Sequence, residues 1–197
     1  MSMQGYNVLI VGIGGQGTIL ASNILGEACI IEGRHVKGAE THGMAQRGGS
    51  VESHIRIDGL FGPLIAPKTA DLLIAFDLLE ALRYSHYLST QGEMIANRHL
   101  VLPTSVYTQN IAAPQEPEII AALKKYRLCA LDADQIAQDA GSPLSANVVM
   151  LGAASHALPL SPASLLEAVR RSVPKKTVEV NVRAFEKGRN AGGSCQR

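Results

Sequence analysis

A glycine-rich segment near the start of the chain is the first place where residue types and spacing could do chemistry. It has the spacing GxGxxG and includes Gly12, Gly14, Gly15, Gln16 and Gly17. Glycine permits a sharp turn and lets backbone N–H groups approach a phosphate, which then lies at the positive end of the following helix. The pattern predicts a diphosphate-binding turn. The alternative is a tight strand–helix crossover in which the third glycine serves packing alone.

An acidic residue further along the chain bears on whether this turn binds a dinucleotide. In dinucleotide-binding proteins, such a residue lies about 20 positions after the glycines and binds the ribose hydroxyls. The corresponding window contains Lys37, Gly38, Ala39 and Glu40, so Glu40 is the candidate, although it is displaced into a loop. A free-standing protein that binds NAD(P) or flavin by itself therefore stays an open alternative.

A second unusual segment, GAETHGMAQRGGSV at 38–51, contains charged residues beside glycines. Its Arg47 places a planar set of hydrogen-bond donors next to Gly48 and Gly49, where the backbone is free to approach a ligand or another chain. A surface loop in which Glu40 and Arg47 pair with each other is the alternative. His42 could donate to a substrate carboxylate, or it could be exposed to solvent without a role.

The hydrophobic pattern predicts the strands and helices that position these segments. Short apolar or alternating runs predict strands, and three- to four-residue spacing predicts helices. We expect strands at 7–11, 35–37, 50–57, 70–76, 92–97 and 128–131, and helices at 18–32, 77–87, 147–157, from 161 and around 178–185. Residues 34–49 are otherwise expected to be a loop, 50–57 a half-exposed strand and 108–118 a long connection. The result is an α/β fold with a mostly parallel sheet and helices on both faces, in one domain over 1–197 with a frayed tail at about 189–197.

Composition limits the functional classes. The chain has 18 Lys and Arg against 17 Asp and Glu, with a net charge of +1 and no sustained basic run, which argues against nucleic acid or an anionic membrane as a partner. No apolar stretch is long enough to span a membrane, so we expect a soluble, cytoplasmic protein. Three scattered cysteines, Cys29, Cys129 and Cys195, exclude a disulfide framework, a Cys-ligated zinc and an iron–sulfur cluster held by this chain alone.

Four segments together resemble a known family. They are NVLIVGIGGQG, GAETHGMAQRGGSV with its continuation ESHIRID, NVVMLGA and VEVNVRAFEKG, and they occur in order from Asn7 to Gly188. The sequence resembles the gamma-type subunits of the 2-oxoacid:ferredoxin oxidoreductases. Within that family it is most similar to the indolepyruvate branch, where the corresponding chain is the beta subunit.

The resemblance implies a Rossmann-like catalytic-domain fold and a role inside a complex. In this family, a complex oxidatively decarboxylates a 2-oxoacid, here an aryl pyruvate such as indolepyruvate, to an acyl-CoA. A larger partner subunit carries thiamine diphosphate with Mg²⁺ and [4Fe-4S] clusters, coenzyme A is the co-substrate, and ferredoxin takes the electrons. The resemblance therefore implies no resident cofactor, no metal and no assigned catalytic residue in this chain, which should be inactive alone.

The family motifs map onto two groups of residues in this sequence. They are Gly12, Gly14, Gly15, Gln16 and Gly17 in the turn, and Glu40, Gln46, Arg47, Gly48 and Gly49 in the loop. Open α/β sheets bind ligands at the carboxyl ends of their strands. We therefore expect both segments to lie together at that edge, facing the partner's active site and meeting the phosphates of coenzyme A.

Overall fold

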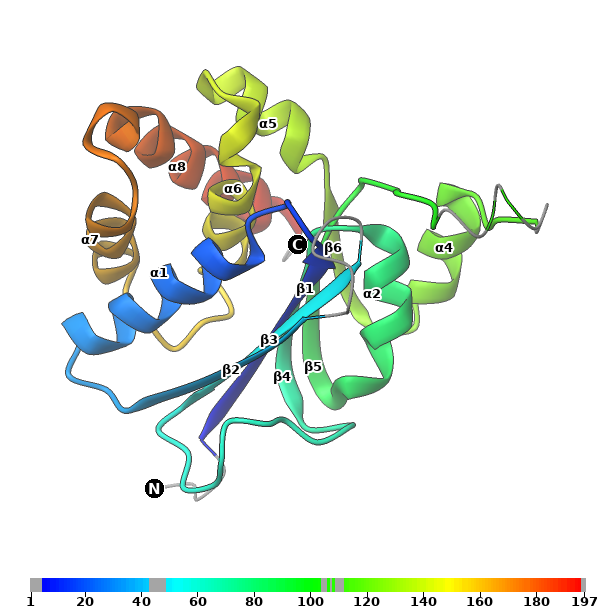
Figure 1. Cartoon of the computed structure of the whole chain (residues 1–197), viewed down its shortest axis with the longest axis horizontal. Helices are drawn as coiled ribbons and strands as arrows, with labels where there is room; N and C mark the ends of the chain where they lie inside the picture. Colours follow the sequence, from blue (N-terminus) through cyan, green and yellow to red (C-terminus); the bar gives the residue numbers. More distant parts are fainter. Residues whose placement is uncertain (1–4, 43–48, 104–105, 107, 109–111, 196–197) are drawn as a thin grey trace.

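A six-stranded mixed sheet forms the centre of the molecule, in the strand order β2–β3–β1–β4–β5–β6 (Figure 1). The structure is a computed structural model and describes residues 5–42, 49–103, 106, 108 and 112–195. The strands are β1 (Tyr6–Ile13), β2 (Val36–His42), β3 (Ser50–Ile57), β4 (Ala70–Ala75), β5 (Leu88–Asn97) and β6 (Arg127–Leu131). β1, β4, β5 and β6 are parallel, whereas β3 is antiparallel to β1 and β2. The predicted α/β class is confirmed.

Helices cover both faces of the sheet (Figure 1). One face carries α1 (Thr18–Ile31), α5 (Ala133–Ala140), α6 (Ala146–Ala154), α7 (Pro162–Ser172) and α8 (Val178–Cys195). The other face carries α2 (Leu78–Tyr84) and α4 (Glu116–Leu123). Because helices cover both faces, all four apolar residues 8–11 of the central strand β1 are fully buried.

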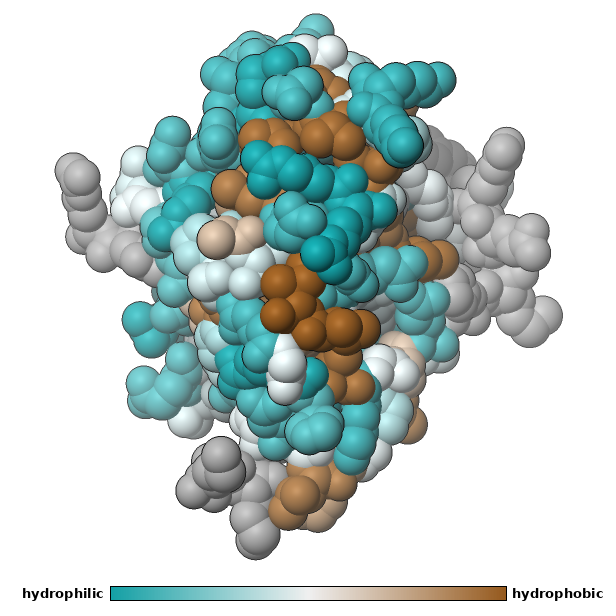
Figure 2. All heavy atoms as spheres, turned by 90° about the vertical axis from the view of Figure 1, so that its left-hand side faces the viewer, coloured by the Kyte–Doolittle hydropathy of each residue, from teal (hydrophilic) through white to brown (hydrophobic). Residues whose placement is uncertain are grey.

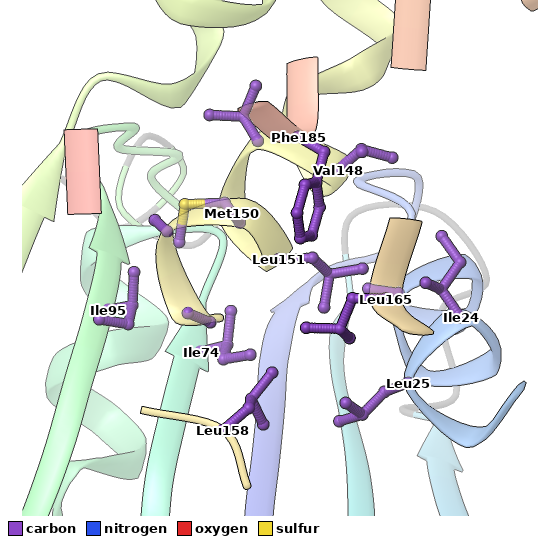
Figure 3. Packing of buried hydrophobic residues seen from close by; sticks show 14 of the residues in the cluster. Ile24, Leu25, Ile74, Ile95, Val148, Met150, Leu151, Leu158, Leu165 and Phe185 are labelled. Carbon is purple, nitrogen blue, oxygen red and sulfur yellow. The ribbon is translucent and has the colours of Figure 1, made fainter. Parts of the chain in front are cut away.

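The helix α6 lies at the centre of the larger helical layer. In Figure 3, its Met150 lies on the side of Ile95 of β5, and its Val148 and Leu151 lie beside Phe185 of α8. Phe185 is fully buried in this cluster. The apolar face of α6 therefore joins the sheet to the outer helices.

Glycines allow α6 and α8 to approach closely. A Cβ atom added to Gly188 of α8 would lie 2.8 Å from the carbonyl carbon of Val149, and one added to Gly192 would lie 2.7 Å from Cα of Ala153. Real Cβ atoms do not come so near to backbone atoms. The sequence prediction of a frayed tail from residue 189 is therefore wrong for 189–195, because these residues continue α8 and pack against α6.

The outer surface of this helical layer is mainly hydrophilic. Figure 2 shows the side on which α1 and α7 lie, with apolar strips between larger hydrophilic areas. Two large apolar side chains of α1 are exposed, Ile19 at 43% and Ile30 at 63%. No helix in the described part of the chain is long and apolar enough to cross a membrane.

The hairpin formed by β2 and β3 differs from the sequence prediction. Part of the predicted loop at 34–49 is strand, since β2 continues to His42 and pairs with β3 throughout, while residues 43–48 lie outside the described part of the chain. β3 lies inside the sheet and is buried on both faces rather than half-exposed. Its polar side chains His54 and Arg56 are 3% and 7% exposed, because the segment after β3 folds back over them: the backbone N–H of Ile65 donates to Nδ1 of His54 at 3.1 Å, and Arg56 donates to the carbonyl of Leu64 at 2.9 Å.

Cys129 and Cys195 form a single disulfide, which the sequence analysis, having excluded a disulfide framework, did not expect. The two residues are 66 positions apart in the chain, yet their Cα atoms are 5.4 Å apart. The sequence prediction failed because it judged the cysteines by their separation along the chain, whereas α8 brings its last residue back beside β6. Cys29 is a free, buried thiol, and burial raises its pKa to about 11.

Two short helices were not predicted, and both begin at good capping residues. The predicted connection at 108–118 ends inside α4, where the N–H of Gln115 donates to Oε2 of Glu118 at 2.8 Å in a capping box. α5 begins after Asp132, whose Oδ1 accepts from the N–H of Gln135 at 2.9 Å, and ends at Gly141 with φ of 111°.

Candidate functional site

The glycine turn between β1 and α1 is folded as its sequence requires. Gly15 and Gly17 have φ values of 108° and 81°, in the left-handed region that favours glycine. Gly12 lies where β1 meets the helix, and a Cβ there would lie 2.9 Å from Cγ2 of Thr18. The prediction of a tight strand–helix turn is confirmed, and packing accounts for Gly12.

Gln16 has a structural contact within the turn. Its Oε1 accepts from the N–H of Ile13 at 2.8 Å, and its own N–H donates to the carbonyl of Ile13 at 3.1 Å. The residue that precedes α1 is Gly17, which has no side chain to cap the helix. The amides of the first helical turn therefore have no side-chain cap among the described residues, and they give this end of α1 a positive character.

The glycine turn and the end of the predicted loop lie together. The N–H of Gly14 donates to the carbonyl of Gly49 at 2.9 Å, because β1 and β3 are antiparallel neighbours whose ends meet there. Gln46, Arg47 and Gly48, the other candidates in this loop, lie outside the described residues. The structure thus brings the glycine turn and the last part of the predicted loop to one edge of the sheet.

A cavity of about 230 Å³ opens beside this turn, at the carboxyl ends of the parallel strands. The helix after β1 covers one face of the sheet and the helix after β4 covers the other, so the two connections leave in opposite directions. Ligands of open α/β sheets bind at such a switch point. The lining residues are Gly15, Gln16, Gly17, Phe76, Asn97, His99, Asp134, Pro143, Leu144, Ala146, Asn147 and Met150.

Asn147, at the start of α6, contacts the glycine turn and also lines the cavity. Its side-chain amide Nδ2 lies 3.4 Å from the carbonyl oxygen of Gly17, and a Cβ on Gly17 would lie 2.6 Å from Nδ2. Asn147 is 5% exposed. A side chain at position 17 would therefore displace the Asn147 side chain, and the positive φ there would strain any residue other than glycine.

A hydrogen-bonded pair, His99 and Asp134, forms another part of the cavity wall. Nδ1 of His99 lies 2.8 Å from Oδ2 of Asp134, and Nδ2 of Asn97 donates to the same oxygen at 3.2 Å. Asn97 is the last residue of β5, and Asp134 lies in the first turn of α5. Sequence reasoning did not select these residues, although the polar Asn97 at the end of a predicted strand was a usable signal.

Asp77 follows β4 at the same edge and serves mainly to hold backbone. Its carboxylate is fully buried and accepts from the N–H groups of Leu79 at 2.8 Å, Glu80 at 3.3 Å and Val101 at 2.7 Å. Burial raises the pKa of Asp77, and these N–H groups partly offset the effect. Asp77 caps α2, while the Glu80 carboxylate accepts from Ser50.

Glu40 lies away from the cavity, in a separate groove between α1 and β2. Its Oε1 accepts from the hydroxyl of Ser22 at 2.9 Å. In a dinucleotide fold, the strand with the acidic residue is the neighbour of β1. Here β3 lies between β1 and β2, which moves Glu40 one strand spacing further away, about 4.8 Å. This arrangement disfavours the nicotinamide-type use of Glu40.

The described residues do not form a metal centre. No three His, Cys, Asp or Glu side chains among them are grouped so that they could hold a metal ion. Two of the three cysteines are bonded to each other, and Cys29 is buried on the inner face of α1. These residues do not fit an iron–sulfur cluster.

Comparison with known proteins gives consistent results for sequence and fold. Residues 7–191 match the family model described as pyruvate ferredoxin/flavodoxin oxidoreductase. The chain is 40% identical over 188 residues to the indolepyruvate oxidoreductase subunit IorB of Archaeoglobus fulgidus, covering 93% of this chain and 94% of that one. It is 38% identical over 192 residues to the IorB subunit of Thermococcus kodakarensis, with 94% and 95% covered.

The fold is similar to that of a solved gamma subunit. The keto/oxoacid ferredoxin oxidoreductase gamma subunit of Geobacter sulfurreducens superimposes with a TM-score of 0.72 at 27% identity, covering 96% of this chain and 99% of that one. Both its sequence and its fold therefore show that the chain belongs to the pyruvate ferredoxin/flavodoxin oxidoreductase family, as a gamma-type subunit.

Proposed function

We propose that this chain is the small subunit of an indolepyruvate-type 2-oxoacid:ferredoxin oxidoreductase and acts together with a larger chain. The observation that carries the proposal is the 40% identity to an indolepyruvate oxidoreductase subunit over nearly the full length of both chains. The cavity at the carboxyl ends of the strands supports it, since that is where a ligand shared with a partner would be bound.

The proposed reaction converts an aryl 2-oxoacid, coenzyme A and oxidised ferredoxin into an acyl-CoA, carbon dioxide and reduced ferredoxin. The bond between the keto carbon and the carboxylate breaks, and carbon dioxide leaves. The keto carbon loses two electrons, which reduce two ferredoxins by one electron each. The thiol of coenzyme A loses its proton and its sulfur bonds to the acyl carbon.

The larger chain would hold the cofactors. Thiamine diphosphate, when bound there, supplies the electron sink for cleavage of the carbon–carbon bond, and iron–sulfur clusters carry the electrons. In this chain, the proposed role of Gly15, Gly17 and the end of α1 is to offer backbone N–H groups to the phosphates of coenzyme A. Gln46, Arg47, Gly48 and Gly49 would extend that contact from the neighbouring loop.

The decisive experiment is co-expression of this chain with the larger chain, followed by an assay of 2-oxoacid-dependent dye reduction. We expect activity with indolepyruvate and coenzyme A from the complex, and none from either chain alone. Pyruvate and 2-oxoglutarate serve as competing substrates that test the aryl preference. Full activity of the larger chain alone would overturn the proposal.

A free-standing dinucleotide-binding protein is the alternative that the same preparation can test. Saturable stabilisation of the isolated chain by NAD(P) or flavin, measured as a thermal shift, would favour it. The position of Glu40, two strands from β1, argues against that outcome.

A further inference from the structure

The pair of His99 and Asp134 is the part of the cavity that the glycine turn does not explain. His99 follows β5 and lines the cavity together with Gly15 and Gly17. Both side chains are accessible, His99 at 42% and Asp134 at 47%. A hydrogen-bonded pair at this position can therefore meet a ligand that enters the cavity.

Asn97 fixes this pair to the scaffold. Its Oδ1 accepts from the N–H of Ala133 at 2.9 Å, while its Nδ2 donates to Asp134 at 3.2 Å and lies 3.5 Å from the carbonyl oxygen of Phe76. Asn97 is 4% exposed. One buried amide thus joins the ends of β4 and β5 to the first turn of α5, and Asp134 can hold His99 in a defined orientation.

The hydrogen bond to Asp134 determines which ring nitrogen is left for the cavity. A carboxylate accepts hydrogen bonds, so the 2.8 Å contact places a proton on Nδ1 of His99. Nε2 lies on the other side of the ring, and no described residue forms a hydrogen bond with it. When His99 carries two protons, Nε2 becomes a charged donor. When it carries one, Nε2 has only a lone pair.

The groups around the cavity contribute charge of both signs. The uncapped start of α1 contributes the positive end of a helix dipole. The charged groups that face His99 are Asp134 from α5 and the buried Asp77 before α2. The lining residues from the glycine turn, from 143–145 and from α6 contain no titratable side chain. The carboxylate of Asp134 would hold the imidazolium opposite the bound anion.

We propose that His99 binds an anionic group of the ligand through Nε2–H, and that Asp134 is its positioning residue. The cavity of about 230 Å³ admits such a group but is smaller than the roughly 300 Å³ or more of sites that enclose a whole drug-sized ligand. The group is a phosphoryl of coenzyme A or the carboxylate of the 2-oxoacid, and this identification rests on the proposed function. Only the doubly protonated ring offers Nε2–H, so binding is stronger at lower pH.

Anion binding can be measured on the full chain without the partner. Inorganic phosphate and acetate are titrated while the imidazole proton resonances are followed by NMR, with His99→Gln used to assign the His99 signal. We expect phosphate, acetate or both to raise the titration midpoint of His99 and to leave that of His86 unchanged. His86 is a suitable control because it is exposed and its Nδ1 lies 2.9 Å from the carbonyl oxygen of Arg83. No response, or an equal response of both histidines, would overturn the proposal.

Kinetics of the complex identify the source of the anion. For His99→Gln we expect the KM of one substrate to rise roughly tenfold or more, as for loss of a hydrogen bond between charged groups. A rise in KM for coenzyme A assigns the phosphoryl group, and a rise for the 2-oxoacid assigns the carboxylate. Asp134→Asn should give the same pattern more weakly, and His86→Gln should change neither constant.

The outcomes separate this inference from the proposed function. An active wild-type complex whose His99→Gln variant keeps both KM values would refute the inference and leave the proposed function standing. A wild-type complex without 2-oxoacid-dependent activity would refute the proposed function, and the NMR titration would then decide the inference by itself.

Discussion

Replacement of Gly188 by alanine tests the close approach of α6 and α8 most directly. Alanine is favoured over glycine within a helix by about 1 kcal/mol. At Gly188, however, the new Cβ would lie 2.8 Å from the carbonyl carbon of Val149 and even closer to its oxygen. These are backbone atoms of α6 and cannot rotate away, so the two helices must separate.

The cost of that separation exceeds the gain in helix propensity. Overpacking a well-packed core costs about 1–3 kcal/mol, and a backbone obstacle places this site at the upper end of the range. Subtracting about 1 kcal/mol for helix propensity leaves a net loss of about 2 kcal/mol. Separation of the helices would also loosen the packing of Phe185, which is fully buried between them.

Gly26 provides a matched control on α1. It also lies within a helix, but a Cβ there would have no heavy atom within 4 Å. We expect Gly26→Ala to stabilise the chain by about 0.5–1 kcal/mol. The free energies of unfolding of both variants should be measured by urea denaturation, monitored by circular dichroism. The comparison requires that the dependence of the free energy on urea concentration has the same slope in both variants. If Gly188→Ala stabilised the chain as much as Gly26→Ala, the close packing of α6 on α8 would be refuted.

Two further predictions concern a histidine and the disulfide. Burial lowers the pKa of His54 below its ordinary 6.5, so the unfolded chain binds a proton that the folded chain does not. The free energy of unfolding should therefore fall as pH falls below about 6.5. Urea denaturation between pH 5 and 7.5 should show a weaker pH dependence for His54→Asn than for the wild type. An unchanged pH dependence would contradict the lowered pKa of His54. Reduction of the Cys129–Cys195 disulfide, whose cysteines are 66 positions apart, should lower the free energy of unfolding by up to about 4 kcal/mol on the chain-entropy model. Mass spectrometry after alkylation of the native chain should show no labelled cysteine before reduction, since Cys29 is buried and its thiol pKa is about 11, and two labelled cysteines afterwards; two labels on the unreduced chain would show that the bond is absent.

The elements with strong periodicity were predictable, and those defined by tertiary contacts were not. β1 and α1 follow from a continuous apolar run, a glycine turn and a helical stripe, all of which are local signals. The length of β2 was missed because its sequence, VKGAETH, has few apolar residues and becomes a strand by pairing with β3. The polar face of β3 suggested exposure, and only the segment that covers His54 makes it buried.

The candidate site also contains residues that the sequence reveals locally and residues that only the fold brings together. The glycine turn was visible because it is contiguous in the sequence, whereas His99 and Asp134 come from separate segments that no spacing rule connects. The turn and the end of the neighbouring loop were correctly expected to lie at one edge, as the bond from Gly14 to Gly49 shows. Glu40 was misplaced because the position of β3 between β1 and β2 depends on strand order, which local pattern does not reveal.

The contact between Asn147 and Gly17 also bears on the order in which the molecule can be assembled. These two residues are 130 positions apart, and β1 pairs on both sides with strands that follow it in the chain. During synthesis, the glycine turn leaves the ribosome long before α6, which carries Asn147, has been made. Pairing over such distances slows folding because the intervening loops must close first. The cavity is thus completed late, and a chain that stops before α6 would contain the glycine motif without the wall that gives it a binding site.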